Sequence, residues 1–197
     1  MSGVPSEAYR IPRKVGFFGG SFNPPHFSHV LAVHYALLRW QFDFIIVAPT
    51  YEHPFEKDLV DFEHRVHMTR IAFEHLGSFV HILPIEKELP KPSYTWQTLA
   101  HIQELYPDSE VTLLIGSDLV AELPSWNHPE VIAQYPMCVI PRTGIQIAGQ
   151  HEAGVLPAAS SSEIRNMLRE GKDVSHLVPW RVLQYIREYE LYTSNNA

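Results

Sequence analysis

Hydrophobic and polar positions divide the chain into two alternating kinds of segment. Short, nearly continuous apolar runs are bounded by turn residues, which is typical of strands buried on both faces of a parallel sheet. These runs lie at residues 15–19, 44–48, 79–83, 111–116 and 137–140. The spacing of apolar residues elsewhere predicts helices over 29–40, 61–76, 95–106, 129–134, 160–169 and 178–186.

This β-α-β-α order predicts an α/β fold with a doubly wound, mainly parallel sheet of five or six strands and a small C-terminal helical part. Residues 143–157 are weakly patterned and are expected to form a loop with at most one short strand. We expect residues 1–13 to be a flexible tail, 14–192 to form a single domain and 193–197 to be a second tail. Ligands of such sheets bind beyond the carboxyl ends of the strands, so we expect the chemistry in the loops that follow them.

Composition excludes several classes of partner. The formal net charge is −7 and no cluster of Lys and Arg is present, which argues against a nucleic-acid partner. No apolar run approaches the length of a membrane span, and the N-terminus lacks the apolar stretch of a secretory signal. The single cysteine, Cys138, lies in an apolar run and is expected to be a buried, inert thiol, which favours a reducing cytoplasm.

The loop after the first predicted strand carries the most distinctive residues. Its glycines let backbone amides approach an anion, and it delivers His26 and His29 to one face at a helix start, where both can donate hydrogen bonds to phosphate. An isolated pair of this spacing is more often a helix cap with solvated imidazoles, and we interpret His64 and His67 in that structural sense. The segment reads Gly19-Gly20-Ser21-Phe22-Asn23-Pro24-Pro25-His26-Phe27-Ser28-His29.

This segment resembles the signature of the nicotinate/nicotinamide mononucleotide adenylyltransferases, within the His-x-Gly-His nucleotidylyltransferase superfamily, with Ser28 where the signature usually has glycine. The segment 160–165 is similar to the family's second signature, Ile-Ser-Ser-Thr-x-Ile-Arg, with Ala159 and Ser162 as replacements. A helix N-terminus with Arg165 one turn inside it suits the β- and γ-phosphates of a nucleotide. A capped surface helix is the alternative interpretation.

The resemblance implies a Rossmann-like fold and transfer of the adenylyl group of ATP to nicotinate or nicotinamide mononucleotide, giving the dinucleotide and pyrophosphate in NAD biosynthesis. It implies that His26, His29 and Arg165 are catalytic, with His26 stabilising the transition state. The implied ATP-binding residues are Gly19, Gly20, Ser21, Phe22, His26, His29, Gly116, Asp118, Ser161, Ser162 and Arg165. The implied mononucleotide-binding residues are Asn23, Lys57, Thr95, Trp126 and Arg142.

The acceptor side rests on weaker signals. Thr95 ends a Ser-Tyr-Thr segment that resembles the family's contact with the pyridine ring, and Trp126 resembles a tryptophan that stacks on that ring. Trp126 could instead close the edge of the core, and we assign Trp96 to packing. Arg65 and Arg142 match arginines common in the family, although each could form a surface ion pair.

The implied reaction needs few special groups. A phosphate monoester has a second pKa of about 6, so the acceptor phosphate is already ionised near pH 7 and needs no general base. The enzyme has to align two anions and neutralise the developing charge. Mg²⁺ is expected to be held mainly by the ATP phosphates and water, with no metal ligands from the protein.

Other functions remain open at this point. Within the superfamily, the alternatives are a phosphopantetheine adenylyltransferase or a cytidylyltransferase. A non-catalytic nucleotide-binding module draws its only support from Ser28. A metal hydrolase draws on the twelve histidines, but they lack metal-site spacing. The sequence leaves open whether the preferred acceptor is nicotinate or nicotinamide mononucleotide. It also leaves open whether the protein forms a homo-oligomer.

Overall fold

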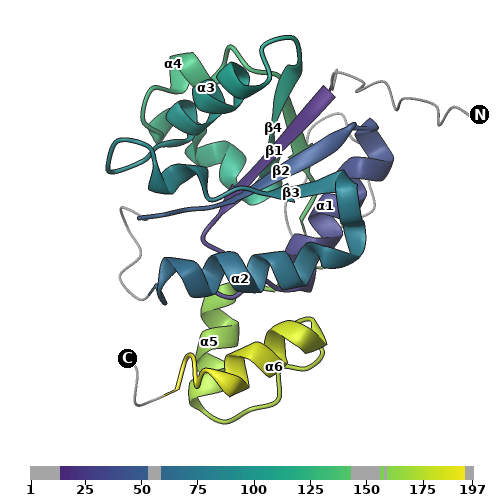
Figure 1. Ribbon diagram of the computed structural model, residues 1–197, viewed down its shortest axis with the longest axis vertical. Helices are drawn as coiled ribbons and strands as arrows, with labels where there is room; N and C mark the ends of the chain where they lie inside the picture. Colours follow the sequence, from purple (N-terminus) through teal and green to yellow (C-terminus); the bar gives the residue numbers. More distant parts are fainter. Residues whose placement is uncertain (1–13, 53–58, 143–155, 158, 194–197) are drawn as a thin grey trace, which may run out of the picture.

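A five-stranded parallel sheet lies between helices in the computed structural model, which describes residues 14–52, 59–142, 156–157 and 159–193 (Figure 1). The strand order is β3-β2-β1-β4-β5, and every neighbouring pair is parallel. The doubly wound α/β fold predicted from the sequence is therefore confirmed. The strands are β1 (Lys14–Gly20), β2 (Phe44–Pro49), β3 (Val80–Ile82), β4 (Glu110–Gly116) and β5 (Met137–Ile140).

The predicted helices are all present, but most of their ends differ by one or two residues from the predicted ones, and two differences are larger. The second helix was expected to reach residue 76, but it tightens at Phe73 into a 3-10 segment that contains Gly77 at φ 52°. The loop expected after the fourth strand contains a long 3-10 segment, η3 (Ser117–Ser125). The α-helices are α1 (Phe27–Trp40), α2 (Phe62–Phe73), α3 (Thr95–Leu105), α4 (Pro129–Ile132), α5 (Ser161–Arg169) and α6 (Trp180–Glu188), and the other 3-10 segments are η1 (Glu74–Phe79) and η2 (Ile85–Lys87).

Helices cover both faces of the sheet, which explains why its strands are mostly apolar. In β2, Ile45 and Val47 belong to the core on the α1 and α2 side, whereas Phe44 and Ile46 belong to the core on the α3 and α4 side (Figure 1). Because successive side chains point to opposite faces, a strand covered on both sides is apolar at most positions, and the buried Thr112 of β4 is an exception.

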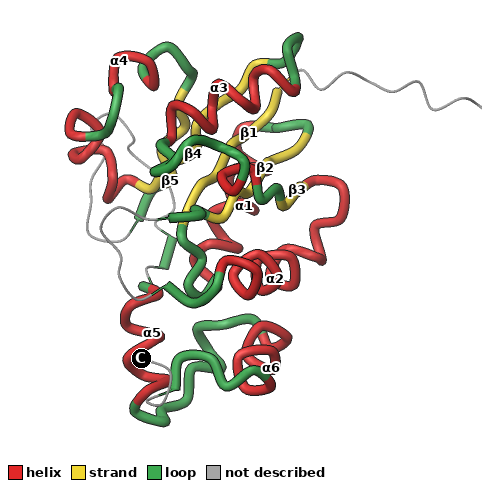
Figure 2. The backbone as a smooth tube through the Cα atoms, turned by 60° about the vertical axis from the view of Figure 1, so that its left-hand side comes forward, coloured by secondary structure: helices red, strands yellow, loops and turns green. Residues whose placement is uncertain are grey.

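The C-terminal helices α5 and α6 lie beyond α2, away from the sheet (Figures 1 and 2). They share the core of the α1 and α2 face, to which α6 contributes Val182 and Ile186. On α2, His64 Nδ1 lies 2.8 Å from the Tyr185 hydroxyl of α6, and the His67 ring stacks on Tyr185 at 4.5 Å between centroids. These contacts agree with a structural interpretation of this second histidine pair.

The single cysteine of the chain, Cys138, lies in β5. It is half-buried, and burial raises the pKa of its thiol. Within the described parts of the chain, no helix combines the length and the apolar character that a bilayer crossing would require.

The strand order reverses between β1 and β4, and this reversal defines the position of the site. In open parallel sheets, a crevice forms at such a switch point, outside the carboxyl ends of the two strands. Here those ends are Gly20 and Gly116. The loop with the first signature and the turn with Asp118 therefore begin side by side.

Candidate active site

The loop after β1 is anchored by Phe22, which adopts a left-handed backbone conformation with φ 47°. Its side chain is only 1% exposed and meets the edge of the His29 ring at 4.9 Å between centroids. It also approaches Phe73 of α2 at 6.4 Å. The side chain of this predicted ATP-binding residue thus lies in the core, where it supports His29.

The two signature histidines stack on each other at the start of α1. His26 directly precedes the helix and His29 lies in its first turn, and their ring centroids are 3.7 Å apart with an interplanar angle of 25°. The backbone N–H of His26 donates to Nδ1 of His29 over 3.2 Å. Since Nδ1 accepts, the neutral His29 ring carries its proton on Nε2 and can donate there.

Both imidazoles are neutral at pH 7. Burial and then the Arg142 charge lower the pKa of His26 from 6.5 to about 3. Burial, His26 and Arg142, in that order, also lower the pKa of His29. Nδ1 of His26 is buried without a hydrogen-bond partner among the described residues. An unsatisfied buried polar atom costs about 1–3 kcal/mol, so a ligand that satisfied it would be favoured.

The second signature touches the first through side-chain contacts. Ser160 caps α5, because its Oγ accepts from the Glu163 N–H over 3.1 Å. Ser161 Oγ donates to the Pro24 carbonyl over 3.0 Å. Arg165, which is 6% exposed, donates from Nη1 to the Asn23 carbonyl over 2.9 Å. The structure therefore brings the two predicted phosphate-binding segments together.

Ser28 adds a third contact between these segments. Its side chain lies at the position where the signature usually has glycine, and it is 4% exposed. Its Oγ accepts from the Ala159 N–H, over 2.9 Å, just before α5. The hydroxyl is thus part of the contact between α1 and the chain that leads into α5.

The turn after β4 joins Asp118 to Arg142. Arg142 Nε lies 3.5 Å from Asp118 Oδ1, and the Arg142 N–H donates to Ser117 Oγ over 3.0 Å. A Cβ on Gly116 would lie 2.2 Å from Asp118 Oδ1 and 2.9 Å from Arg142 Nε, so this pair requires a glycine. Arg142 was assigned to the mononucleotide, and it lies beside a residue that was assigned to ATP.

Asn23 is fully buried, and its side chain is engaged within the protein. Its Oδ1 accepts from the Tyr192 hydroxyl over 2.9 Å and from the Val60 N–H over 3.3 Å. Asn23, a predicted mononucleotide-binding residue, therefore links the loop after β1 to the segment just before α2 and to the chain that follows α6.

The acceptor-side residues lie on neighbouring elements. Thr95 opens α3 and Trp126 follows η3, and both are part-buried. Trp96 Nε1 donates to Asn127 Oδ1 over 2.9 Å, which ties α3 to the loop with Trp126 and agrees with the packing role expected for Trp96. Lys57 lies outside the described residues.

Arg65 has a larger structural role than the sequence indicated. It is 1% exposed and donates to four backbone carbonyls. Its acceptors are Ser21 at 2.9 Å, Thr50 at 2.6 Å, Tyr51 at 3.0 Å and Val60 at 3.0 Å. It also lines a cavity of about 430 Å³ together with Tyr51, Glu52, Leu59, Val60, Asp61 and Phe62. One guanidinium thus fixes the loops that follow β1 and β2.

Comparison with known proteins agrees with this arrangement. The Cytidylyltransferase-like family model matches residues 17–167. A relative from Anaeromyxobacter dehalogenans, named "Probable nicotinate-nucleotide adenylyltransferase", is 40% identical, and the match covers 91% of this chain and 97% of that protein. The nicotinate-nucleotide adenylyltransferase of Bacillus subtilis is 31% identical, over 92% of this chain and 100% of that protein.

A solved structure shares the fold. It is the Plasmodium falciparum nicotinic acid mononucleotide adenylyltransferase complexed with NaAD, with a TM-score of 0.76 and 22% identity over 91% of this chain and 97% of that one. The two signature segments, their contact beside the switch point and the similarity over more than 90% of the chain lead to one assignment. The chain belongs to the nicotinate-nucleotide adenylyltransferases of the Cytidylyltransferase-like family.

Proposed function

We propose that this protein transfers the adenylyl group of ATP to nicotinate mononucleotide, forming the dinucleotide and releasing pyrophosphate. The names of the relatives favour nicotinate over nicotinamide as the acceptor. The observation that carries the proposal is the joining of the two signatures. Arg165 and Ser161 contact the carbonyls of Asn23 and Pro24, immediately before the stacked His26 and His29.

The chemistry follows from these groups. An oxygen of the acceptor phosphate, already ionised at pH 7, forms a new bond to the α-phosphorus of ATP while the bond to the bridging oxygen breaks. No proton has to be removed, so neither histidine acts as a base. His29 Nε2–H and the His26 ring donate to phosphate oxygens on which charge accumulates, and the amides at the α5 N-terminus hold the leaving phosphates.

Mg²⁺ would arrive with the nucleotide in this proposal. No three His, Cys, Asp or Glu side chains lie together as a metal site among residues 14–52, 59–142 and 159–193. We propose that the triphosphate and water provide most of its ligands, as is common for this ion. Bound Mg²⁺ would reduce the repulsion between the two anionic substrates.

The direct test is to incubate the protein with ATP, Mg²⁺ and one mononucleotide at a time, and to measure initial rates of dinucleotide formation. We expect the higher kcat/KM with nicotinate mononucleotide. Phosphopantetheine as acceptor, and CTP as donor, test the related activities of the superfamily. Absence of dinucleotide from either pyridine mononucleotide would refute the proposed function.

A variant tests the role of His26. His26→Ala should lower kcat by roughly 100- to 1000-fold, as expected for loss of one preorganised donor. The exposed His176 provides the matched control, His176→Ala, which should keep wild-type turnover. Pyrophosphate release measures both. Near-native turnover of His26→Ala would show that the reaction does not use this imidazole.

A further inference from the structure

Glu86 is a buried carboxylate that the proposed chemistry does not use. It lies in η2, between β3 and α3, and is only 5% exposed. Burial raises the pKa of its carboxyl, although hydrogen bonds from the Ser93 hydroxyl and the Tyr51 N–H oppose that effect. A buried carboxylate is costly unless it is well hydrogen-bonded, so its contacts indicate what it holds.

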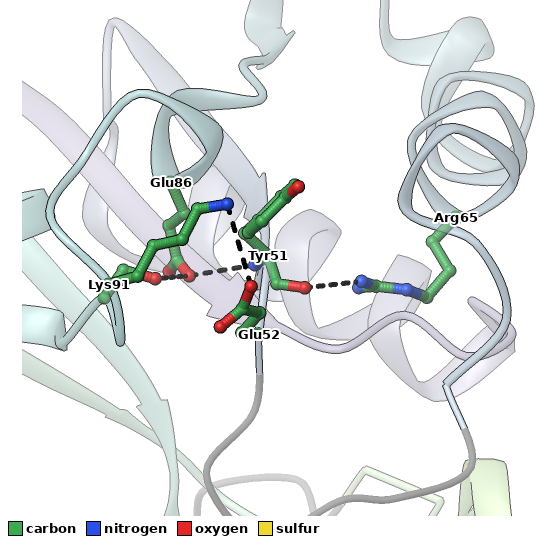
Figure 3. A network of polar contacts seen from close by, with 6 residues as sticks. Tyr51, Glu52, Arg65, Glu86 and Lys91 are labelled. Atoms are coloured by element: carbon green, nitrogen blue, oxygen red, sulfur yellow. Dashed lines mark hydrogen bonds and ion pairs between the residues drawn. The ribbon is translucent and has the colours of Figure 1, made fainter.

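One oxygen of Glu86 joins two loops. Its Oε2 accepts from the Ser93 hydroxyl over 2.7 Å. The same oxygen accepts from the Tyr51 N–H over 3.1 Å (Figure 3). Tyr51 belongs to the loop after β2, whereas Ser93 precedes Thr95 at the entrance of α3. The loop after β2 and the segment with the predicted pyridine contact therefore share one acceptor atom.

Arg65 also contacts the backbone of Tyr51, at its carbonyl group. The carbonyl of Tyr51 accepts from Arg65 Nη2 over 3.0 Å, while the N–H of Tyr51 donates to Glu86 (Figure 3). Lys91 Nζ lies 4.1 Å from the centroid of the Tyr51 ring and 3.7 Å from Glu52 Oε1. Tyr51 is thus fixed through its backbone on both sides and through its ring.

The contacts that join the two signature segments do not pass through Glu86, although Arg65 also donates to the Ser21 carbonyl in the loop after β1. They run from Ser161 and Arg165 to the loop after β1, and from Ser28 to Ala159. None of these hydrogen bonds involves Glu86. Loss of the Glu86 contacts should therefore disturb the two substrates unequally.

We propose that Glu86 is a positioning residue for the mononucleotide, because its carboxylate fixes the loop after β2 relative to the Ser93-Tyr94-Thr95 segment. This inference rests on the proposed function and extends it. A preorganised acceptor pocket loses affinity when its loops must be ordered on binding. The expected signature is a raised KM for the mononucleotide with an unchanged KM for ATP.

The test compares Glu86→Ala with Glu86→Gln. Alanine removes the shared acceptor, whereas glutamine keeps one oxygen that can still accept from both donors. We expect Glu86→Ala to raise the KM for nicotinate mononucleotide about tenfold or more, with the KM for ATP within about twofold of wild type. Glu86→Gln should recover most of that loss. Glu88→Ala, two residues further on the surface, is the matched control and should match wild type.

Ser93→Ala keeps the inference testable if Glu86→Ala does not fold. It removes one donor to the Glu86 carboxylate, so the KM for the mononucleotide should rise about threefold to fivefold while the KM for ATP stays constant. Equal increases in both KM values, or a fall in kcat alone, would overturn the inference. So would a mononucleotide KM in Glu86→Ala that equals wild type. A wild-type protein without dinucleotide synthesis would instead refute the proposed function, and the inference with it.

Discussion

Acidification should destabilise this protein through the buried His26. The pKa of its imidazole is about 3 in the folded chain, against 6.5 for an ordinary histidine, mainly because of burial. The unfolded chain therefore takes up the proton first as the pH falls. The contribution of the neutral ring to stability is complete above pH 6.5 and is lost progressively between pH 6.5 and about 3.

The size of the loss follows from these two pKa values. At pH 5 the unfolded imidazole is almost fully protonated, whereas the folded one is still neutral. The free energy of unfolding should thus fall by about 2 kcal/mol between pH 7 and pH 5, with a limiting slope of about 1.4 kcal/mol per pH unit. This fall in the free energy of unfolding barely changes if the pKa of the folded His26 is one unit higher, because the folded ring is then still neutral at pH 5.

The assay is urea unfolding at pH 5, 6, 7 and 8, without nucleotide, for wild type and His26→Asn. We expect the variant to lose about 2 kcal/mol less than wild type between pH 7 and pH 5, because its amide does not titrate. Glu86, whose pKa burial raises, gives a pH dependence of the opposite sign, but it titrates in both proteins and cancels. His176→Asn, at an exposed site, is the control and should follow wild type. If wild type and His26→Asn lose equal stability over this range, His26 is not neutralised by burial.

Three further substitutions have expected outcomes. Arg65→Met removes the donor to four backbone carbonyls and should lower the free energy of unfolding by about 3 kcal/mol, measured in urea; an unchanged midpoint would contradict this. Gly116→Ala would place a Cβ 2.2 Å from Asp118 Oδ1, so we expect kcat/KM for ATP to fall about tenfold in initial-rate assays while thermal stability changes little. Ser28→Gly loses the hydrogen bond to the Ala159 N–H and should cost about 1 kcal/mol in urea unfolding, and a stability equal to wild type would show that this contact contributes nothing.

The sheet was predictable because its strands are covered on both sides. A strand such as β2 is apolar at all its buried positions, and the turn residues that bound it mark its ends. Helix ends were less predictable, since the change to a 3-10 segment after Phe73 depends on a left-handed Gly77 that any amphipathic pattern tolerates. Local pattern thus determined the elements, whereas tertiary packing determined where they end.

The resemblance assigned residues of both signatures to the same nucleotide, which agrees with their contact in the structure, but it did not indicate the contacts that several of their side chains make within the protein. Phe22 and Asn23 lie in a signature loop, so the resemblance assigned them to ATP and to the mononucleotide, respectively. In the structure, the Phe22 side chain packs against His29, and Asn23 Oδ1 accepts from the Tyr192 hydroxyl. Glu86 stood out in no pattern, because a single acidic residue between a strand and a helix is ordinary loop composition. Only the fold shows that this carboxylate is buried and that it accepts hydrogen bonds from the Ser93 hydroxyl and the Tyr51 N–H.

The distribution of charge explains how an acidic chain can serve two anionic substrates. The net charge is −7, and the two most buried arginines among the described residues, Arg65 and Arg165, both donate to backbone carbonyls of the loop after β1. These cations shape the loop as well as adding positive potential beneath it. Neutral donors, namely the two imidazoles and the amides at the α1 and α5 N-termini, lie on the segments that the contacts of Ser161 and Arg165 bring together. Because neutral donors lose less hydration than ammonium or guanidinium groups on burial, they can be held stacked and desolvated before any phosphate arrives.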